Sequence, residues 1–210
     1  MESAPVQVIE SCMVAPPTPT NSGRRLWLSP LDVALANTGR TCQVFLYRSG
    51  AAFLDVARLK EAMAKALVVY YPLAGRLIGD DGGVRVVEIS CNGEGALFVV
   101  ARSRSLTAQD VDFSKPSPEL NTKFGPSIVD PQLILATQVN FLKCGAVVLA
   151  VSMHHALVDG VSASHFMQHW SALYRGDDGG DDELRCHDHT LLRARSPPAV
   201  HPDALSVLYY

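Results

Sequence analysis

The chain has 210 residues, a formal net charge of −3 and a pI near 6.1, with 48% hydrophobic and 19% charged residues. This length suits one domain with a sizeable core, and the composition excludes an intrinsically disordered protein. The slightly acidic balance gives no reason to expect a nucleic-acid partner.

The cysteines and the first residues indicate the cellular compartment of the protein. Five cysteines are scattered without a repeated spacing, which favours reduced thiols over a disulfide framework. The segment 1–5 has neither the basic start nor the apolar run of a secretory signal. No apolar stretch approaches the roughly 20 residues that span a bilayer. We therefore expect a cytoplasmic protein with no membrane association.

The first part of the chain predicts two strands and one long helix. The strands are expected at 6–15 and 42–47. Asp55 can cap a helix that runs to about Tyr70, and Pro72 and Gly75 are expected to end it. The apolar stripe of this helix contains Val56, Leu59, Met63, Leu67 and Tyr70.

The middle of the chain predicts mainly β-structure. Strands are expected at 76–78, 84–90, 96–101, 133–141 and 146–153. Glycines at 79–83 predict a tight turn between the first two, and a turn at 143–145 makes the last two a hairpin. A loop rich in proline and serine is expected from 113 to 131. Because strands and helices mix without strict alternation, the expected fold class is α/β, a layered domain with a mixed sheet.

A second amphipathic helix is expected at 161–174. Its apolar residues Phe166, Trp170 and Leu173 follow the i, i+4, i+7 spacing. The acidic, glycine-rich segment 176–183 that follows predicts a solvated loop.

Two adjacent histidines, His154 and His155, lie between the buried strand expected at 146–151 and this helix. A polar side chain at such a strand end can face a cleft while its backbone stays fixed. A neutral imidazole there can accept a proton at pH 7, because its unperturbed pKa is about 6.5. A single histidine in this place is more often a hydrogen-bonded structural residue. Here the pair is followed by Asp159 and Gly160, a pattern that rarely arises by chance.

This His-His-x-x-x-Asp-Gly pattern resembles the signature of the acyl-CoA-dependent acyltransferases. They include the plant BAHD acyltransferases, chloramphenicol acetyltransferase and the condensation domains of peptide synthetases. Further segments resemble the BAHD family in the family's own order, and they are 26–32 (LWLSPLD), 71–76 (YPLAGR), 91–95 (CNGEG) and 190–198 (TLLRARSPP). The resemblance implies that 1–210 is the N-terminal domain of the chloramphenicol acetyltransferase-like two-domain fold.

The resemblance also implies a function and roles for residues. The chain would transfer an acyl group, with a hydroxycinnamoyl group expected, from a CoA thioester to an amine or hydroxyl acceptor. His155 would be the general base, acyl-CoA a co-substrate, and no cofactor would be bound. Asp159 would be structural, paired with an arginine in the family, and Gly160 would let the backbone turn.

Three residues of the strand at 42–47 and its start are implied to line the acceptor site. Thr41, Gln43 and Phe45 share one face of this strand. Gln43 and Phe45 are larger than we expect for shikimate or quinate acceptors, which leaves an amine acceptor open. The alternative is that the three residues only pack against the core.

One family motif is absent. No Asp-Phe-Gly-Trp-Gly string, typical of the second half of BAHD proteins, occurs in the sequence. The alternative hypothesis is therefore a truncated, non-catalytic fragment or a partner-binding domain. Such a chain would expose a face that the second half normally covers, and would self-associate through it.

No metal site is expected. His165 and His169 have the spacing of a zinc protease helix, but Phe166 stands where that chemistry requires glutamate. The cluster at 186–189 (CHDH) has no partner pair at zinc-finger spacing, so a polar loop is the better interpretation.

Overall fold

A computed structural model describes residues 6–20, 23–36, 38–48, 54–79, 86–113 and 118–177. Its centre is a five-stranded sheet of order β1-β6-β7-β8-β3. The strands are β1 (Gln7–Val14), β3 (Arg40–Tyr47), β6 (Ala96–Arg102), β7 (Leu135–Phe141) and β8 (Val147–His154). The β6–β7 pair is parallel and the other three pairs are antiparallel, so the sheet is mixed as predicted.

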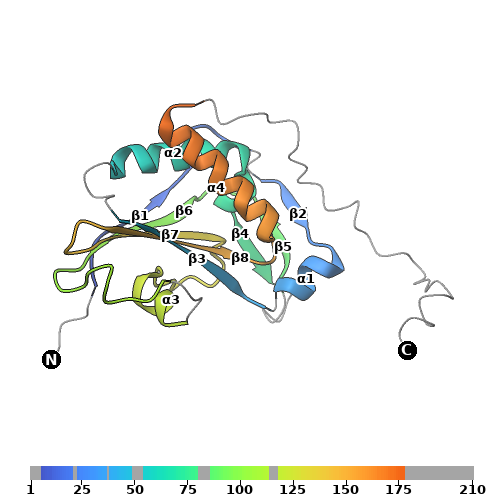
Figure 1. Ribbon diagram of the computed structural model, residues 1–210. Coiled ribbons are helices and arrows are strands. Elements are labelled where there is room, and N and C mark those ends of the chain that lie inside the picture. The colour runs from blue at the N-terminus through green and yellow to red at the C-terminus, as the bar shows by residue number, and fades with distance from the viewer. Residues whose placement is uncertain are drawn as a thin grey trace, which may run out of the picture.

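A smaller antiparallel sheet of order β2-β5-β4 lies beside one end of the large sheet (Figure 1). Its strands are β2 (Arg25–Trp27), β4 (Arg76–Gly79) and β5 (Val86–Ser90). An isolated bridge between Arg76 and Leu133 connects β4 to the segment that leads into β7. The turn expected at 79–83 lies almost entirely outside the described residues.

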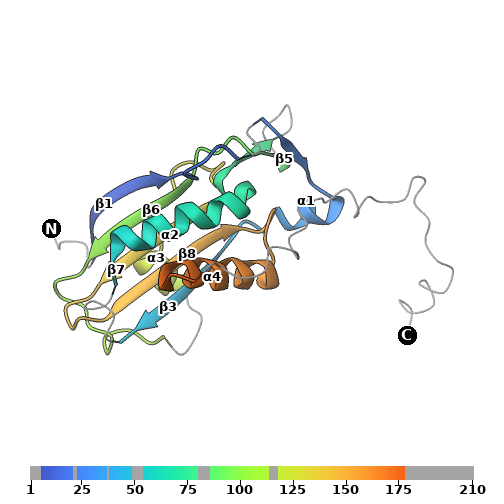
Figure 2. The ribbon, with the colours of Figure 1, turned by 90° about the horizontal axis from the view of Figure 1, so that it is seen from above.

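Helices cover both faces of the large sheet. The two long helices, α2 (Val56–Val69) and α4 (Gly160–Arg175), lie side by side on one face, and α3 (Pro118–Phe124) lies on the other (Figures 1 and 2). The short helix α1 (Pro30–Ala36) precedes β3. We call the two surfaces of the sheet the α2/α4 face and the α3 face.

Helix α2 begins where its sequence predicts. Asp55 is the N-cap, and its carboxylate accepts hydrogen bonds from the N–H groups of Ala57 (2.9 Å) and Arg58 (3.1 Å). The end is confirmed as well, because α2 stops at Val69 with Tyr70 as its C-cap. After Tyr70 the chain continues as the 3₁₀ helix η2 (Tyr71–Ala74), in which Pro72 is accommodated in the first turn, where no N–H donor is needed.

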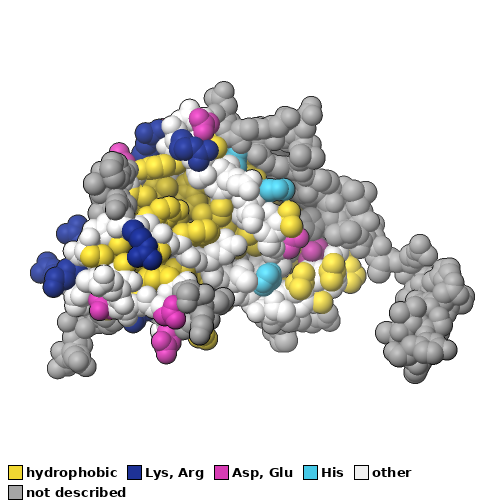
Figure 3. Space-filling view, viewed as in Figure 1, with side chains coloured by type: hydrophobic (Ala, Val, Ile, Leu, Met, Phe, Trp, Pro, Cys, Tyr) yellow, Lys and Arg dark blue, Asp and Glu magenta, His cyan; other side chains and the backbone are white. Residues whose placement is uncertain are grey.

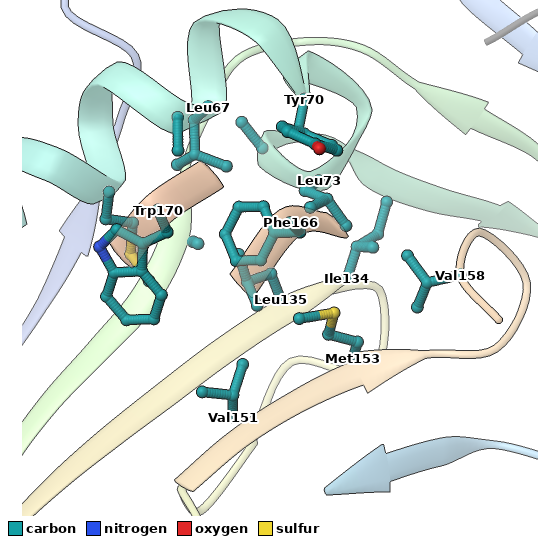
Figure 4. Close-up of a cluster of buried hydrophobic side chains, with 14 of the residues drawn as sticks. Leu67, Tyr70, Leu73, Ile134, Leu135, Val151, Met153, Val158, Phe166 and Trp170 are labelled. Atoms are coloured by element: carbon teal, nitrogen blue, oxygen red, sulfur yellow. The ribbon is translucent and has the colours of Figure 1, made fainter. Parts of the chain in front are cut away.

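The α2/α4 face holds the main core. Phe166 of α4 is fully buried, with its ring 5.4 Å from that of Tyr70 in an edge-on contact. The indole N–H of Trp170 donates to the carbonyl of Leu59 at 3.0 Å and joins α4 to α2. Both rings lie over Val151 and Met153 of β8 (Figure 4). The expected amphipathic stripes of both helices therefore meet each other and the sheet.

The α3 face contains buried polar side chains. Asn140 is fully buried and donates to the carbonyls of Phe124 (2.9 Å) and Val148 (3.1 Å). Its own carbonyl accepts from the amide of Gln138 at 2.8 Å. This network ties α3 to β7 and β8.

The strong apolar patterns are confirmed as elements, and the short elements were missed. The helix α3 lies in the segment expected to be a loop, and α1 and β2 lie in the segment 24–36, for which no element was expected. Across the described residues, no helix is both long and apolar enough to cross a membrane.

Candidate active site

The candidate site is the turn that follows β8. His154 ends the strand, and the N–H of Leu157 donates back to the His154 carbonyl at 3.1 Å. The N–H of His155 donates to the carbonyl of Gly39 at 3.0 Å. Gly39 has φ of +83°, a left-handed conformation that favours glycine, between α1 and β3. The backbone of the histidine pair is thus fixed to the start of β3.

The imidazole of His155 is held in one tautomer. Its Nδ1 lies 3.1 Å from the carbonyl oxygen of Val158. A carbonyl only accepts, so Nδ1 carries the proton and Nε2 has a free lone pair in the neutral ring. His155 is half-buried, and within the described part of the chain its Nε2 has no hydrogen-bond partner.

His154 has the opposite tautomer. Its Nδ1 accepts the N–H of Ala156 at 3.2 Å, so the proton of the neutral ring is on Nε2. Burial lowers the pKa of His154 to about 4, with the positive charges of Arg40 and His155 as smaller causes. A ring that stays neutral and already uses its Nδ1 is poorly suited to act as a base near pH 7.

Asp159 is the N-cap of α4. Its carboxylate accepts from the N–H of Ser162 at 2.8 Å, and the Ser162 hydroxyl accepts the Asp159 N–H at 2.9 Å, which completes a capping box. The Ser162 hydroxyl and N–H lower the pKa of the carboxyl. Asp159 is exposed, and no described arginine forms an ion pair with it. The expected arginine partner is not among its contacts here.

Gly160 differs from expectation. It is the first residue of α4 and is not among the glycines with positive φ. An added Cβ would meet no described heavy atom within 4 Å. Neither a positive φ nor a close neighbour therefore demands glycine at this position, and the role of Gly160 stays a prediction.

The three candidate acceptor residues lie on the α2/α4 face of β3. Thr41 is opposite Met153 of β8, Gln43 opposite Val151, and Phe45 opposite Leu149. Thr41 is exposed, whereas Gln43 and Phe45 are half-buried. At about 3.3 Å per residue, Thr41 is about 7 Å along the strand from Gly39, Gln43 about 13 Å and Phe45 about 20 Å. Thr41 is therefore the nearest of the three to the attachment point of the His155 turn.

The candidate metal ligands do not form a group. His165 is exposed on α4, whereas His169 is buried beside Tyr70, with 5.6 Å between the ring centroids. Among the described residues, no three His, Cys, Asp or Glu side chains are placed to share a metal ion. The cluster at 186–189 and the segment 190–198 lie outside the described residues.

Residues of the site outside the histidine motif were missed, and Arg40 is the main example. Arg40 lies opposite His154 in the register, and its guanidinium donates to the carbonyls of Ile134 (3.1 Å) and Leu133. No local pattern reveals this contact, because donor and acceptors are more than ninety residues apart in the chain. The capping box could have been found, since Asp159 and Ser162 have the spacing of this motif.

Comparisons with known proteins identify the family. The model of the transferase family matches residues 4–207. Two putrescine hydroxycinnamoyltransferases of Oryza sativa subsp. japonica are 41% and 42% identical over 95% and 94% of this chain. A shikimate O-hydroxycinnamoyltransferase of Nicotiana tabacum is 40% identical over 92% of it. The chain spans 66%, 46% and 44% of these three proteins.

Solved structures show the same fold. Vinorine synthase superposes with a TM-score of 0.67 at 25% identity, over 82% of this chain and 43% of that one. TRI101 of F. graminearum superposes with a TM-score of 0.65 at 17% identity, over 86% of this chain and 46% of its own. Together with the family model, these matches show that the chain belongs to the BAHD acyltransferases of the transferase family and corresponds to their N-terminal half.

Proposed function

We propose that His155 is the general base of an acyl transfer from a CoA thioester to an amine or hydroxyl acceptor, with a hydroxycinnamoyl group as the acyl group. The observation that carries this proposal is the fixed tautomer of His155. Its Nδ1–H is bound to the Val158 carbonyl, which leaves Nε2 as a proton acceptor in the family's motif. The names of the relatives support the acyl group.

In this mechanism Nε2 of His155 takes the proton of the acceptor N–H or O–H as the acceptor attacks the thioester carbonyl. The new C–N or C–O bond forms, the C–S bond breaks, and the electron pair leaves with the CoA sulfur. The imidazolium then returns its proton to the thiolate. A well-placed general base contributes about 10²–10⁴-fold in rate.

The neighbouring residues have supporting roles in this proposal. Asp159 fixes the first turn of α4, and with it the turn whose Val158 carbonyl orients His155. Acyl-CoA enters as a co-substrate and no cofactor is bound to the protein. TRI101 has been crystallised with ethyl coenzyme A, which supports a CoA substrate for this fold.

For the acceptor we propose an amine. Gln43 and Phe45 are bulky, which suits a slender amine better than a polyhydroxylated ring. The relatives named for putrescine and for shikimate are almost equally similar, so identity alone does not choose between them. Thr41 is the residue we expect to contact the acceptor nearest the reacting atom.

The test compares His155→Ala with His154→Asn. Both are assayed in this chain and in a fusion to the remaining C-terminal part of a rice putrescine hydroxycinnamoyltransferase, with p-coumaroyl-CoA and putrescine, agmatine or shikimate. We expect His155→Ala to lose about 10²–10⁴-fold in kcat/KM. His154→Asn retains an acceptor for the Ala156 N–H at its Oδ1 and should lose far less. Equal turnover by His155→Ala and the wild type would remove the base assignment.

A second candidate function is a non-catalytic, partner-binding domain that self-associates. The chain spans about half the length of most relatives that it matches. In addition, the α2/α4 face leaves hydrophobic side chains visible between these helices and the edge strand β3 (Figure 3), where Tyr47 is 45% exposed and Phe45 half-buried. Light scattering of the purified chain tests this candidate, and a monodisperse monomer that transfers acyl groups would contradict it.

A further inference from the structure

At the base of the histidine turn, the guanidinium of Arg40 joins the start of β3 to the segment that leads into β7. Nη1 donates to the carbonyl of Ile134 at 3.1 Å, and Nη2 donates to the carbonyl of Leu133. The Ile134 carbonyl also accepts the N–H of His154 at 3.0 Å. One buried carbonyl therefore receives hydrogen bonds from the end of β8 and from the first residue of β3.

The backbone beside Arg40 makes the next contact of the turn. The Gly39 carbonyl accepts the N–H of His155 at 3.0 Å. Gly39 thus binds His155 through its own carbonyl. Arg40 is linked to His154 indirectly, because both donate to the Ile134 carbonyl. Val158 follows His155 closely in the chain. A fixed backbone at His155 therefore also fixes the contact between its Nδ1–H and the Val158 carbonyl, which sets the tautomer.

Segment 130–134, which contains these carbonyls, is also held by residues of β4. Arg76 is 9% exposed and pairs with Asp130 at 3.3 Å and with Glu94 at 3.2 Å. The N–H of Leu77 donates to the Gln132 carbonyl at 2.8 Å. Segment 130–134 therefore lies between Arg76 and Arg40, which gives the YPLAGR and CNGEG segments a structural link to the histidine turn.

We propose that Arg40 is a positioning residue for His155: its planar guanidinium bridges two consecutive carbonyls and so fixes the turn that presents Nε2. The catalytic meaning of this position rests on the proposed function. Arginine suits the task because its fork donates to two acceptors in a defined plane, whereas a lysine ammonium is a point charge on a flexible stem.

The experiment follows the imidazole nitrogens of the histidines by NMR in the chain labelled with isotopes at histidine. Signals of His154 and His155 are assigned with His154→Asn and His155→Gln. The variants are Arg40→Met, which removes both fork and charge, and Arg40→Lys, which keeps the charge and removes the fork. Arg48→Met, an exposed arginine just beyond the other end of β3, is the matched control.

We expect wild type and Arg48→Met to show His155 in the Nδ1–H tautomer alone, and both Arg40 variants to show a mixture of tautomers. In Arg40→Met, His154 should also titrate at higher pH, because a positive charge that opposes its protonation is gone. In Arg40→Lys the His154 titration should stay near that of the wild type. An unchanged His155 tautomer in a folded Arg40→Lys protein would overturn the proposal.

The two variants keep the test decisive if one of them does not fold. Should Arg40→Met fail to fold, Arg40→Lys alone decides, because it retains the charge and the stem. The spectra are recorded without substrate, so an absence of acyl transfer would count against the proposed function and leave this result intact.

Discussion

The two faces of the central sheet are both buried, but different interactions stabilise them. On the α2/α4 face, β7 and β8 present apolar side chains such as Leu135, Val139 and Val151, and packing with α2 and α4 stabilises them. On the α3 face the same strands carry Gln138, Asn140, Ser152 and His154. There stability depends on hydrogen bonds, because a buried polar group without a partner is costly.

The precise geometry of the histidine turn arises on the α3 face. On the α2/α4 face, burial of apolar surface stabilises the packing without a preferred direction. The α3 face ends at His154. The histidine turn is defined by directional hydrogen bonds to the carbonyls of Ile134, Gly39 and Val158 and from the N–H of Ala156.

The largest effect is expected on the apolar face, from Phe166→Ala. The side chain is fully buried between Tyr70 and Trp170, so its removal leaves a large cavity. We expect a loss of about 4 kcal/mol in the free energy of unfolding, measured by urea denaturation. Val161→Ala, on the same helix but 64% exposed, is the control and should change it by less than about 0.5 kcal/mol. Similar values for the two variants would contradict the core assigned to α4.

On the α3 face, we expect Asn140→Ala to lower the free energy of unfolding by about 2–3 kcal/mol. The substitution leaves the carbonyls of Phe124 and Val148 without this donor and the Gln138 amide without its acceptor, all in a buried setting. The same urea measurement applies. Gln109→Ala, an exposed side chain, is the control. A cost below about 0.5 kcal/mol would show that the network does not stabilise this face.

The buried His154 on the α3 face also predicts that the stability of the protein depends on pH. The pKa of His154 is about 4 in the folded protein and about 6.5 when unfolded, so the unfolded state binds more protons between these values. The contribution of His154 to stability is therefore complete above about pH 6.5, falls as the pH drops toward 4, and is constant below it. At about 1.4 kcal/mol for each pKa unit, we expect the loss to be about 3 kcal/mol. His154→Asn has no titrating ring, and its stability should fall less over this interval; identical pH profiles would refute the shift.

The sequence predicted long elements well because burial imposes a period on them. The apolar run before His154 and the stripes of α2 and α4 each gave an element near its observed bounds. The helices α1 and α3 have only seven residues each, which is too few for a reliable helical period, and β2 has three. Asp55 was predicted as a cap because capping is local.

The residues of the site likewise fall into those that a local motif reveals and those that only the fold brings together. His155 and Asp159 were found because they are close together in a recognisable motif. Arg40, Gly39 and the Leu133–Ile134 carbonyls come from elsewhere in the chain, and only the β3–β8 register and the entry into β7 bring them together. The tautomer of His155 depends on a backbone carbonyl, and no side-chain pattern encodes where a carbonyl points.

The smallest effect is expected from Thr137→Val, where the apolar face contains a polar atom. Thr137 is fully buried on the α2/α4 face of β7, opposite Val151, and its Oγ1 has no hydrogen-bond partner among the described residues. Valine has almost the same shape and an equal preference for strands, so the change removes a desolvation cost and little else. We expect a gain of about 1 kcal/mol in the free energy of unfolding, against a change within about 0.5 kcal/mol for Thr41→Val at an exposed strand position. A loss instead of a gain would show that the hydroxyl binds an ordered water, and that the α2/α4 face also relies on a directional bond.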